Sequence, residues 1–162
     1  MLKLILINPD KCVGCRNCAL ACSFAHEELY SLGKARIGTV WISRIGMNVP
    51  MLCQHCTKPL CIDVCPMSAI SRDVKTGAVL QNADLCIACK MCAIVCPFGG
   101  PVIDPEKGTV IKCDLCEGDP ECVKHCVYGA LQFVEASEWN YIKRREGTEK
   151  LAEGLKIMEP NI

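Results

Sequence analysis

The chain has 162 residues, with 18 basic and 18 acidic side chains, so its formal net charge is zero. This balance excludes the basic field that attracts nucleic acid or anionic lipid. Hydrophobic residues make up 51 % of the chain, but aromatic residues only 5 %. A small chain with so few large core side chains usually needs metals or crosslinks to remain folded.

Short elements are expected along the chain, in the following order. Residues 1–7 predict a strand that ends at Asn8-Pro9-Asp10. Residues 18–28 predict a short helix, and residues 34–48 a single added strand. Residues 61–67 then predict a second short helix, and residues 78–81 a strand. Turns are expected at Gly77, Gly108 and Gly129 and near Pro50, Pro105 and Pro120.

No apolar run approaches the roughly 18 residues that a membrane-spanning helix needs. The N-terminal stretch Leu4-Ile5-Leu6-Ile7 is too short for a secretory signal. We therefore expect a cytoplasmic, reducing location.

Cysteine is the most informative residue, because its sixteen copies form four groups of four with none left over. The groups are Cys12, Cys15, Cys18 and Cys22; Cys53, Cys56, Cys61 and Cys65; Cys86, Cys89, Cys92 and Cys96; and Cys113, Cys116, Cys122 and Cys126. Three closely spaced thiolates with a fourth one helical turn later is the ferredoxin arrangement for a [4Fe–4S] cluster. Sixteen thiolates predict four such clusters.

Disulfide and zinc scaffolds are the alternatives that a cysteine-rich chain raises. A disulfide scaffold needs an oxidising compartment. Structural zinc takes two Cys-x2-Cys pairs separated by a longer loop, which the third cysteine of the first and third groups does not suit. Pro66 and Pro97, directly after Cys65 and Cys96, add the Cys-Pro ending of bacterial ferredoxins. With sixteen thiols present, His26, His55 and His125 are not expected to be ligands.

The cysteine groups are duplicated within the chain. An offset of 74 residues aligns Asn8-Pro9-Asp10-Lys11-Cys12 with Asn82-Ala83-Asp84-Leu85-Cys86. An offset of 60 residues aligns Cys53 and Cys56 with Cys113 and Cys116. The order is therefore a doubled unit.

The two middle groups resemble a compact two-cluster ferredoxin. In such proteins the fourth cysteine of each group binds the neighbouring cluster, which implies four mixed ligand sets. These are set 1 (Cys12, Cys15, Cys18 and Cys126), set 2 (Cys53, Cys56, Cys61 and Cys96), set 3 (Cys65, Cys86, Cys89 and Cys92) and set 4 (Cys22, Cys113, Cys116 and Cys122). Pairing the groups in strict sequence, first with second and third with fourth, remains open.

This resemblance implies an α+β fold of small antiparallel sheets and short helices. One ferredoxin-like unit, residues 49–106, would be inserted into another formed by residues 1–48 and 107–136, with a pseudo-twofold axis between them. Residues 137–162 contain no cysteine. Trp139, Tyr141 and Ile142, followed by Leu151, Leu155 and Met158 at helical spacing, allow a partner-docking arm, whereas Gly147 and Gly154 allow a frayed, solvated terminus.

The whole pattern resembles the iron–sulfur electron-transfer subunits of molybdenum and tungsten pterin oxidoreductases, including the dimethyl sulfoxide reductase and formate dehydrogenase families. The motifs that carry the resemblance are Asn8 to Cys18, Cys53-Gln54-His55-Cys56, Cys86 to Cys92 and Lys112 to Cys116. The compact size favours the type of small subunit that accompanies tungsten aldehyde oxidoreductases. The outer groups depart from the pattern, because Cys22-Ser23 and Cys126-Val127 lack the proline.

The resemblance implies a non-catalytic chain that relays single electrons. One partner would be a catalytic molybdenum or tungsten subunit, and the other a ferredoxin or a flavin-bearing subunit. An alternative is a ferredoxin-like link between carbon monoxide dehydrogenase or formate dehydrogenase and a hydrogenase. An enzyme would need an iron with an open position or a nucleotide loop, and Gly99-Gly100-Pro101 lacks the glycine spacing of such a loop. An iron–sulfur sensor would normally need only one cluster.

Overall fold

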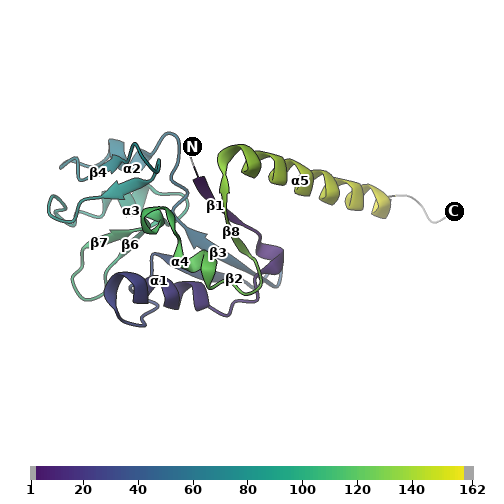
Figure 1. Cartoon of the computed structure of the whole chain (residues 1–162), viewed down its shortest axis with the longest axis horizontal. Helices are drawn as coiled ribbons and strands as arrows, with labels where there is room; N and C mark the ends of the chain where they lie inside the picture. Colours follow the sequence, from purple (N-terminus) through teal and green to yellow (C-terminus); the bar gives the residue numbers. More distant parts are fainter. Residues whose placement is uncertain (1–2, 159–162) are drawn as a thin grey trace.

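A computed structural model describes residues 3–158 of the chain. Short elements surround the cysteine loops, and one long helix extends from the body (Figure 1). The strands are β1 (Lys3–Ile7), β2 (Ile37–Ile42), β3 (Met47–Leu52), β4 (Ile70–Arg72), β5 (Val79–Gln81), β6 (Pro101–Ile103), β7 (Val110–Lys112) and β8 (Leu131–Glu135). The α-helices are α1 (Asn17–Glu27), α2 (Leu60–Asp63), α3 (Met91–Val95), α4 (Glu121–Lys124) and α5 (Ala136–Met158), and the 3-10 helices are η1 (Pro9–Lys11) and η2 (Leu115–Gly118).

The described strands form four two-stranded antiparallel sheets, β1–β8, β2–β3, β4–β5 and β6–β7. β1 pairs with β8 from Lys3↔Glu135 to Ile7↔Leu131, so the segment before the first cysteine group lies beside the segment after the last. The prediction of an α+β fold of small antiparallel sheets and short helices is confirmed.

The duplication seen in the sequence also appears in the backbone. The Asn8 side chain accepts a hydrogen bond from the Asp10 amide (3.1 Å), and Asn82 accepts the same bond from Asp84 (2.9 Å). Arg16 and Lys90 both have a φ of 63°, in the left-handed region. Because side chains other than glycine avoid this region, its recurrence at an offset of 74 residues indicates that both loops are shaped by the same requirement.

Cysteines form a large part of the buried core. One cluster of buried residues combines Cys22, Cys113 and Cys122 with Leu52 and Leu131. A smaller cluster combines Cys92 with Ile70, Val79 and Val110. The thiols therefore occupy positions that large apolar side chains take in most proteins of this size.

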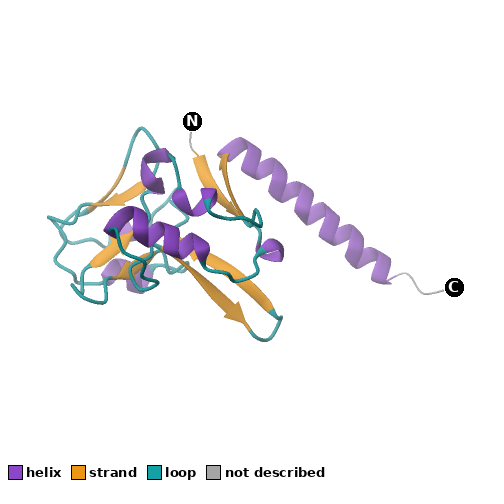
Figure 2. Ribbon diagram, turned by 60° about the horizontal axis from the view of Figure 1, so that its bottom comes forward, coloured by secondary structure: helices purple, strands orange, loops and turns teal. Residues whose placement is uncertain are grey.

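The prediction of a single strand over residues 34–48 is wrong. β2 and β3 form a hairpin whose register runs from Ile37↔Leu52 to Ile42↔Met47. The chain reverses between them because Gly46 adopts a positive φ of 62°. β3 crosses the expected unit boundary between residues 48 and 49. The hairpin projects from the body in Figure 2.

The helix predicted over residues 61–67 is shorter than expected. α2 ends at Asp63, and Ser68 has a positive φ of 49°, which directs the chain into β4. The other short predictions agree with α1, β1 and β5 to within a few residues.

α5 is one continuous helix that extends away from the sheets (Figures 1 and 2). Its first turns are attached to the body by Lys143 Nζ, which donates to Ile7 O over 3.1 Å, and its middle is attached by the Lys150–Asp10 ion pair at 3.0 Å. The predicted apolar positions Leu151, Leu155 and Met158 lie outside the described side chains, and residues 159–162 lie outside the described structure. Within residues 3–158, no helix is both long and apolar enough to cross a bilayer.

Candidate metal centres

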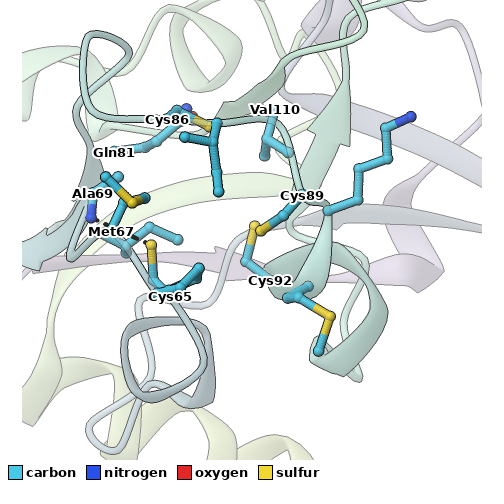
Figure 3. A pocket seen from close by; sticks show the side chains of 13 residues that line it. Cys65, Met67, Ala69, Gln81, Cys86, Cys89, Cys92 and Val110 are labelled. Atoms are coloured by element: carbon cyan, nitrogen blue, oxygen red, sulfur yellow. Dashed lines mark hydrogen bonds between the residues drawn. The ribbon is translucent and has the colours of Figure 1, made fainter.

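Three cavities in the protein are each lined by four cysteines. The first contains Cys12, Cys15, Cys18 and Cys126, which are the members of set 1. The second contains the members of set 3, Cys65, Cys86, Cys89 and Cys92, whose side chains surround the space seen in Figure 3. The third contains the members of set 4, Cys22, Cys113, Cys116 and Cys122. In each cavity the fourth cysteine comes from a different sequence group from the other three.

Two other members of set 2, Cys53 and Cys96, lie near Cys61. Burial raises the pKa of the Cys61 thiol, and the neighbouring Cys53 and Cys96 thiols raise it further, while the Lys112 ammonium opposes the rise. Cys56 belongs to the same loop as Cys53. Cys96 thus lies beside the second cysteine group, as Cys65 lies beside the third.

The loops direct backbone N–H groups at sulfur. The amides of Arg36, Ala69 and Gly100 each donate to a cysteine Sγ over 3.3 Å, and the amide of His55 does so over 3.4 Å. The acceptors are Cys22, Cys65, Cys96 and Cys53. N–H groups directed at sulfur stabilise thiolates, which are the form that binds iron.

The donor set fits an iron–sulfur group. Burial raises the pKa of Cys18, Cys92 and Cys122, and it raises that of Cys113 to about 12. Thiols this desolvated would remain protonated at neutral pH, whereas a bound metal deprotonates its thiol ligands. Each of the three cavities is lined by four cysteine sulfurs, which is the ligand number of a [4Fe–4S] cluster.

A buried histidine lies within the second cysteine loop. His55 is 3 % exposed, and its Nδ1 accepts a hydrogen bond from the Val79 amide over 2.9 Å. The proton is therefore on Nε2, a buried donor without a hydrogen-bond partner in the described part of the chain. Burial, with Lys112 and Arg72 nearby, lowers the pKa of His55 to about 3, so the ring is neutral. A donor left unpaired among cysteines fits a sulfur acceptor supplied by a cluster.

Lys112 is a buried cation, and the sequence did not single it out from the other lysines near the cysteine groups. It is 4 % exposed, and its Nζ donates to Val79 O and, over 3.4 Å, to Cys113 O. The ammonium thus lies between β5 and β7, close to Cys61 and His55. Lys112 differs from the other lysines near the cysteine groups in its burial, and this burial depends on the tertiary fold.

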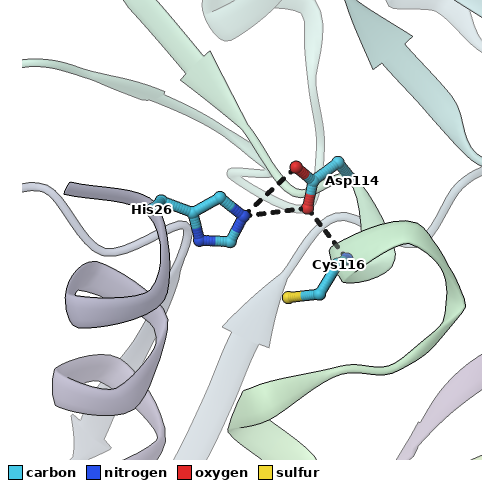
Figure 4. A group of neighbouring side chains, drawn as sticks. All are labelled: His26, Asp114 and Cys116. Atoms are coloured by element: carbon cyan, nitrogen blue, oxygen red, sulfur yellow. Dashed lines mark hydrogen bonds and ion pairs between the residues drawn. The ribbon is translucent and has the colours of Figure 1, made fainter. Parts of the chain in front are cut away.

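A second charged group joins the first cysteine loop to the last (Figure 4). His26 Nδ1 donates to Cys22 O over 2.8 Å, and its Nε2 donates to Asp114 over 3.1 Å. Hydrogen bonds to Asp114, Cys116 and Cys22 raise the pKa of His26 to about 12, so it is a cation. Burial opposes ionisation of Asp114, but His26, the Cys116 amide and Arg36 lower its pKa well below the usual range. His26 therefore acts in an ion pair.

Neighbouring sets lie close enough for their thiols to interact. Cys92 of set 3 lies near Cys61 of set 2, which helps to raise its pKa. Cys53 of set 2 likewise helps to raise the pKa of Cys113 in set 4. Cys18 of set 1 does the same for Cys122 in set 4. The same pairs pack in the two core clusters, Cys61 with Cys92 in one and Cys18 and Cys53 with Cys113 and Cys122 in the other. The sets therefore neighbour one another in the order set 3, set 2, set 4, set 1.

The two exposed cysteines belong to the two ends of this order. Cys89 of set 3 and Cys15 of set 1 are exposed, whereas the other fourteen are buried or half-buried. Leu85, Ile87 and Met91 are exposed beside Cys89, and Val13 is exposed beside Cys15. The arrangement has two solvent-facing ends and a shielded middle.

Comparison with known proteins identifies the class. Residues 45–136 match the model of the 4Fe-4S dicluster domain, and residues 4–26 match a 4Fe-4S binding domain. The chain is 46 % identical over 137 residues to the polyferredoxin-like subunit of an aliphatic sulfonate oxidoreductase from Pyrococcus furiosus, covering 85 % of this chain and 79 % of that protein. It is 36 % identical to an uncharacterized ferredoxin of Methanocaldococcus jannaschii, covering 89 % and 80 % of the two chains. A probable anaerobic dimethyl sulfoxide reductase chain of Escherichia coli is 33 % identical, with 88 % and 76 % covered.

The fold, the cysteine cavities and these matches define an iron–sulfur protein of the electron-transfer class that accompanies oxidoreductases, not a catalytic chain. The chain belongs to the 4Fe-4S dicluster domain family. The predicted cofactor class and the predicted resemblance to oxidoreductase iron–sulfur subunits are confirmed.

Proposed function

We propose that the protein binds four [4Fe–4S] clusters through sets 1 to 4 and relays single electrons along the order set 3, set 2, set 4, set 1. When bound, each cluster would accept and release one electron at a time, since four thiolates leave no position for a substrate. The observation that carries the proposal is that each set neighbours the next in this order, with the exposed Cys15 and Cys89 in the two terminal sets.

The chain's own groups would maintain this path. The N–H donors keep the sulfurs oriented, and the buried Lys112 supplies positive charge in the middle of the line. Burial of Cys22, Cys92, Cys113 and Cys122 keeps water away from the interior of the path. In the proposed division into units, residues 49–106 carry sets 2 and 3, while residues 1–48 and 107–136 carry sets 1 and 4.

The proposed partners are a catalytic oxidoreductase subunit at one end and a ferredoxin or a flavin-bearing subunit at the other. The names of the relatives from Pyrococcus furiosus and Escherichia coli support a catalytic partner. Within that class we propose a molybdenum or tungsten pterin enzyme of the aldehyde oxidoreductase type. α5, which extends from the body, is the proposed docking arm.

The test uses the protein purified anaerobically with its native partner. Cys61→Ala removes a ligand of set 2, in the middle of the line, and should lower the iron content by about a quarter. Turnover with the natural acceptor should then be lost, while the catalytic subunit still reduces an artificial dye. Thr57→Ala, at an exposed position in the same loop, is the matched control. Unchanged turnover with the natural acceptor in Cys61→Ala would contradict the proposed path.

A further inference from the structure

The hairpin β2–β3 contributes a polar group to the wall of the set 1 cavity. Thr39 and Pro50 are opposite each other in the hairpin, and both line the cavity with the four cysteines. The rest of the hairpin is largely exposed, including Val40 (51 %) and Trp41 (58 %). Thr39 is therefore the point at which a solvent-exposed hairpin reaches a metal centre.

The Thr39 hydroxyl is a buried donor without an acceptor at normal hydrogen-bond distance. Its Oγ1 is shielded from solvent and forms no hydrogen bond of normal length within residues 3–158, and it lies near the sulfur of Cys18. The other polar side chains of this wall, Lys11, Arg16, His125 and Tyr128, belong to exposed residues whose polar ends can reach water. A buried hydroxyl without a partner is unfavourable by about 1–3 kcal/mol, so such groups normally have one.

Sulfur is the acceptor that this wall can supply. The four thiols of set 1 line the same cavity as Thr39, and as cluster ligands they would be thiolates, which accept hydrogen bonds. Among the described residues, the cavities of sets 3 and 4 have no serine or threonine in their walls. An effect of the Thr39 hydroxyl is therefore expected at set 1, whose cavity it lines.

We propose that the Thr39 hydroxyl donates a hydrogen bond to sulfur at set 1 and so raises the reduction potential of that cluster alone. A hydrogen bond to sulfur draws electron density from the cluster and stabilises its more negative, reduced form. Thr39 is thus a positioning residue that tunes one terminal centre. The inference depends on the proposed binding of a cluster at set 1.

The experiment is a redox titration of the full-length, cluster-loaded protein, followed by electron paramagnetic resonance. Thr39→Val keeps the side-chain shape but removes the hydroxyl, and Thr39→Ser keeps the hydroxyl. In Thr39→Val, one of the four reduction steps should move to lower potential by about tenfold in its equilibrium constant, which is 59 mV for a one-electron couple. The other three steps should not move, and Thr39→Ser should retain the wild-type profile.

Each other outcome is decisive. Four unchanged steps in Thr39→Val, or an equal shift in Thr39→Ser, would overturn the tuning role. Loss of iron from Thr39→Val would also overturn it, because the hydroxyl would then be needed for assembly. Iron and sulfide analysis of the wild-type protein is done first. Fewer than four clusters there would contradict the proposed function, whereas four clusters without a shift would contradict only this inference.

Discussion

Gly100 lies directly against Cys53, although the two residues are in different cysteine groups. A Cβ atom on Gly100 would lie 2.9 Å from Cys53 Cα and 3.1 Å from its Cβ. The Gly100 amide also donates to Cys96 Sγ over 3.3 Å. Glycine at this position therefore lets two ligands of set 2, Cys53 and Cys96, approach each other.

Gly100→Ala is accordingly expected to destabilise set 2. The obstacle is backbone, which cannot rotate away, so the free energy of unfolding should fall by about 1–3 kcal/mol, and the iron content should fall with it. Denaturant unfolding and iron analysis would measure both effects. Gly38→Ala is the control, since a Cβ there meets no atom within 4 Å. If Gly100→Ala kept the wild-type iron content and stability, the backbone around Cys53 would have shifted to accommodate the methyl group, and the prediction would be wrong.

Lys112→Met should lower the reduction potential of the set 2 cluster. The buried ammonium lies near Cys61, where positive charge favours the more negative, reduced state. The loss of its bonds to Val79 O and Cys113 O should also reduce the free energy of unfolding by about 1–3 kcal/mol. Redox titration measures the first effect and thermal unfolding the second. Lys124→Met, which removes an exposed lysine, should leave all four reduction potentials unchanged. If Lys124→Met shifted the potential as much as Lys112→Met, the effect would be one of net charge and not of the buried ammonium.

Removal of iron should unfold most of the body. Six of the eleven buried residues in the larger core cluster are neither leucine nor isoleucine, and three of them are cysteines of set 4. Because metal binding and folding are coupled in such sites, treatment with a chelator under reducing conditions should abolish most of the circular dichroism signal of the body. Restoration of iron and sulfide should recover it. A chelated protein that kept a cooperative thermal transition would contradict this prediction.

Gly147→Ala should stabilise α5 without changing the metal centres. A Cβ at this position meets no atom within 4 Å, and alanine in an exposed helix is favoured over glycine by about 1 kcal/mol. Amide hydrogen exchange measures this stabilisation, and exchange should be slower in the helical turns around residue 147. Gly147→Pro should have the opposite effect and break the helix. Both variants should retain full iron content, and iron loss in either one would show that α5 supports the clusters.

The ion pair of His26 with Asp114 illustrates a group that sequence reasoning did not find. The two residues are 88 positions apart, and only the packing of the first cysteine loop against the last brings them within 3.1 Å. Thr39 is similar, because a hydroxyl in a strand carries no sign of facing a metal cavity. The sequence does not predict the β2–β3 hairpin because its turn, Ser43 to Gly46, has only one glycine to mark it.

The sequence by itself determined the kind of cofactor and the kind of fold. Cysteine spacing is a local property, since three sulfurs within seven to ten residues can surround one cluster whatever the rest of the chain does. The doubled motifs likewise predicted repeated loops, which the matching backbone angles of Arg16 and Lys90 display. Only the tertiary structure decided the order in which the sets neighbour one another and which thiols face solvent. It also decided that Thr39 lines a cysteine cavity and that the Nε2 of His55 is buried. These properties depend on distances between residues far apart in the chain, and those distances are fixed only when the whole molecule packs.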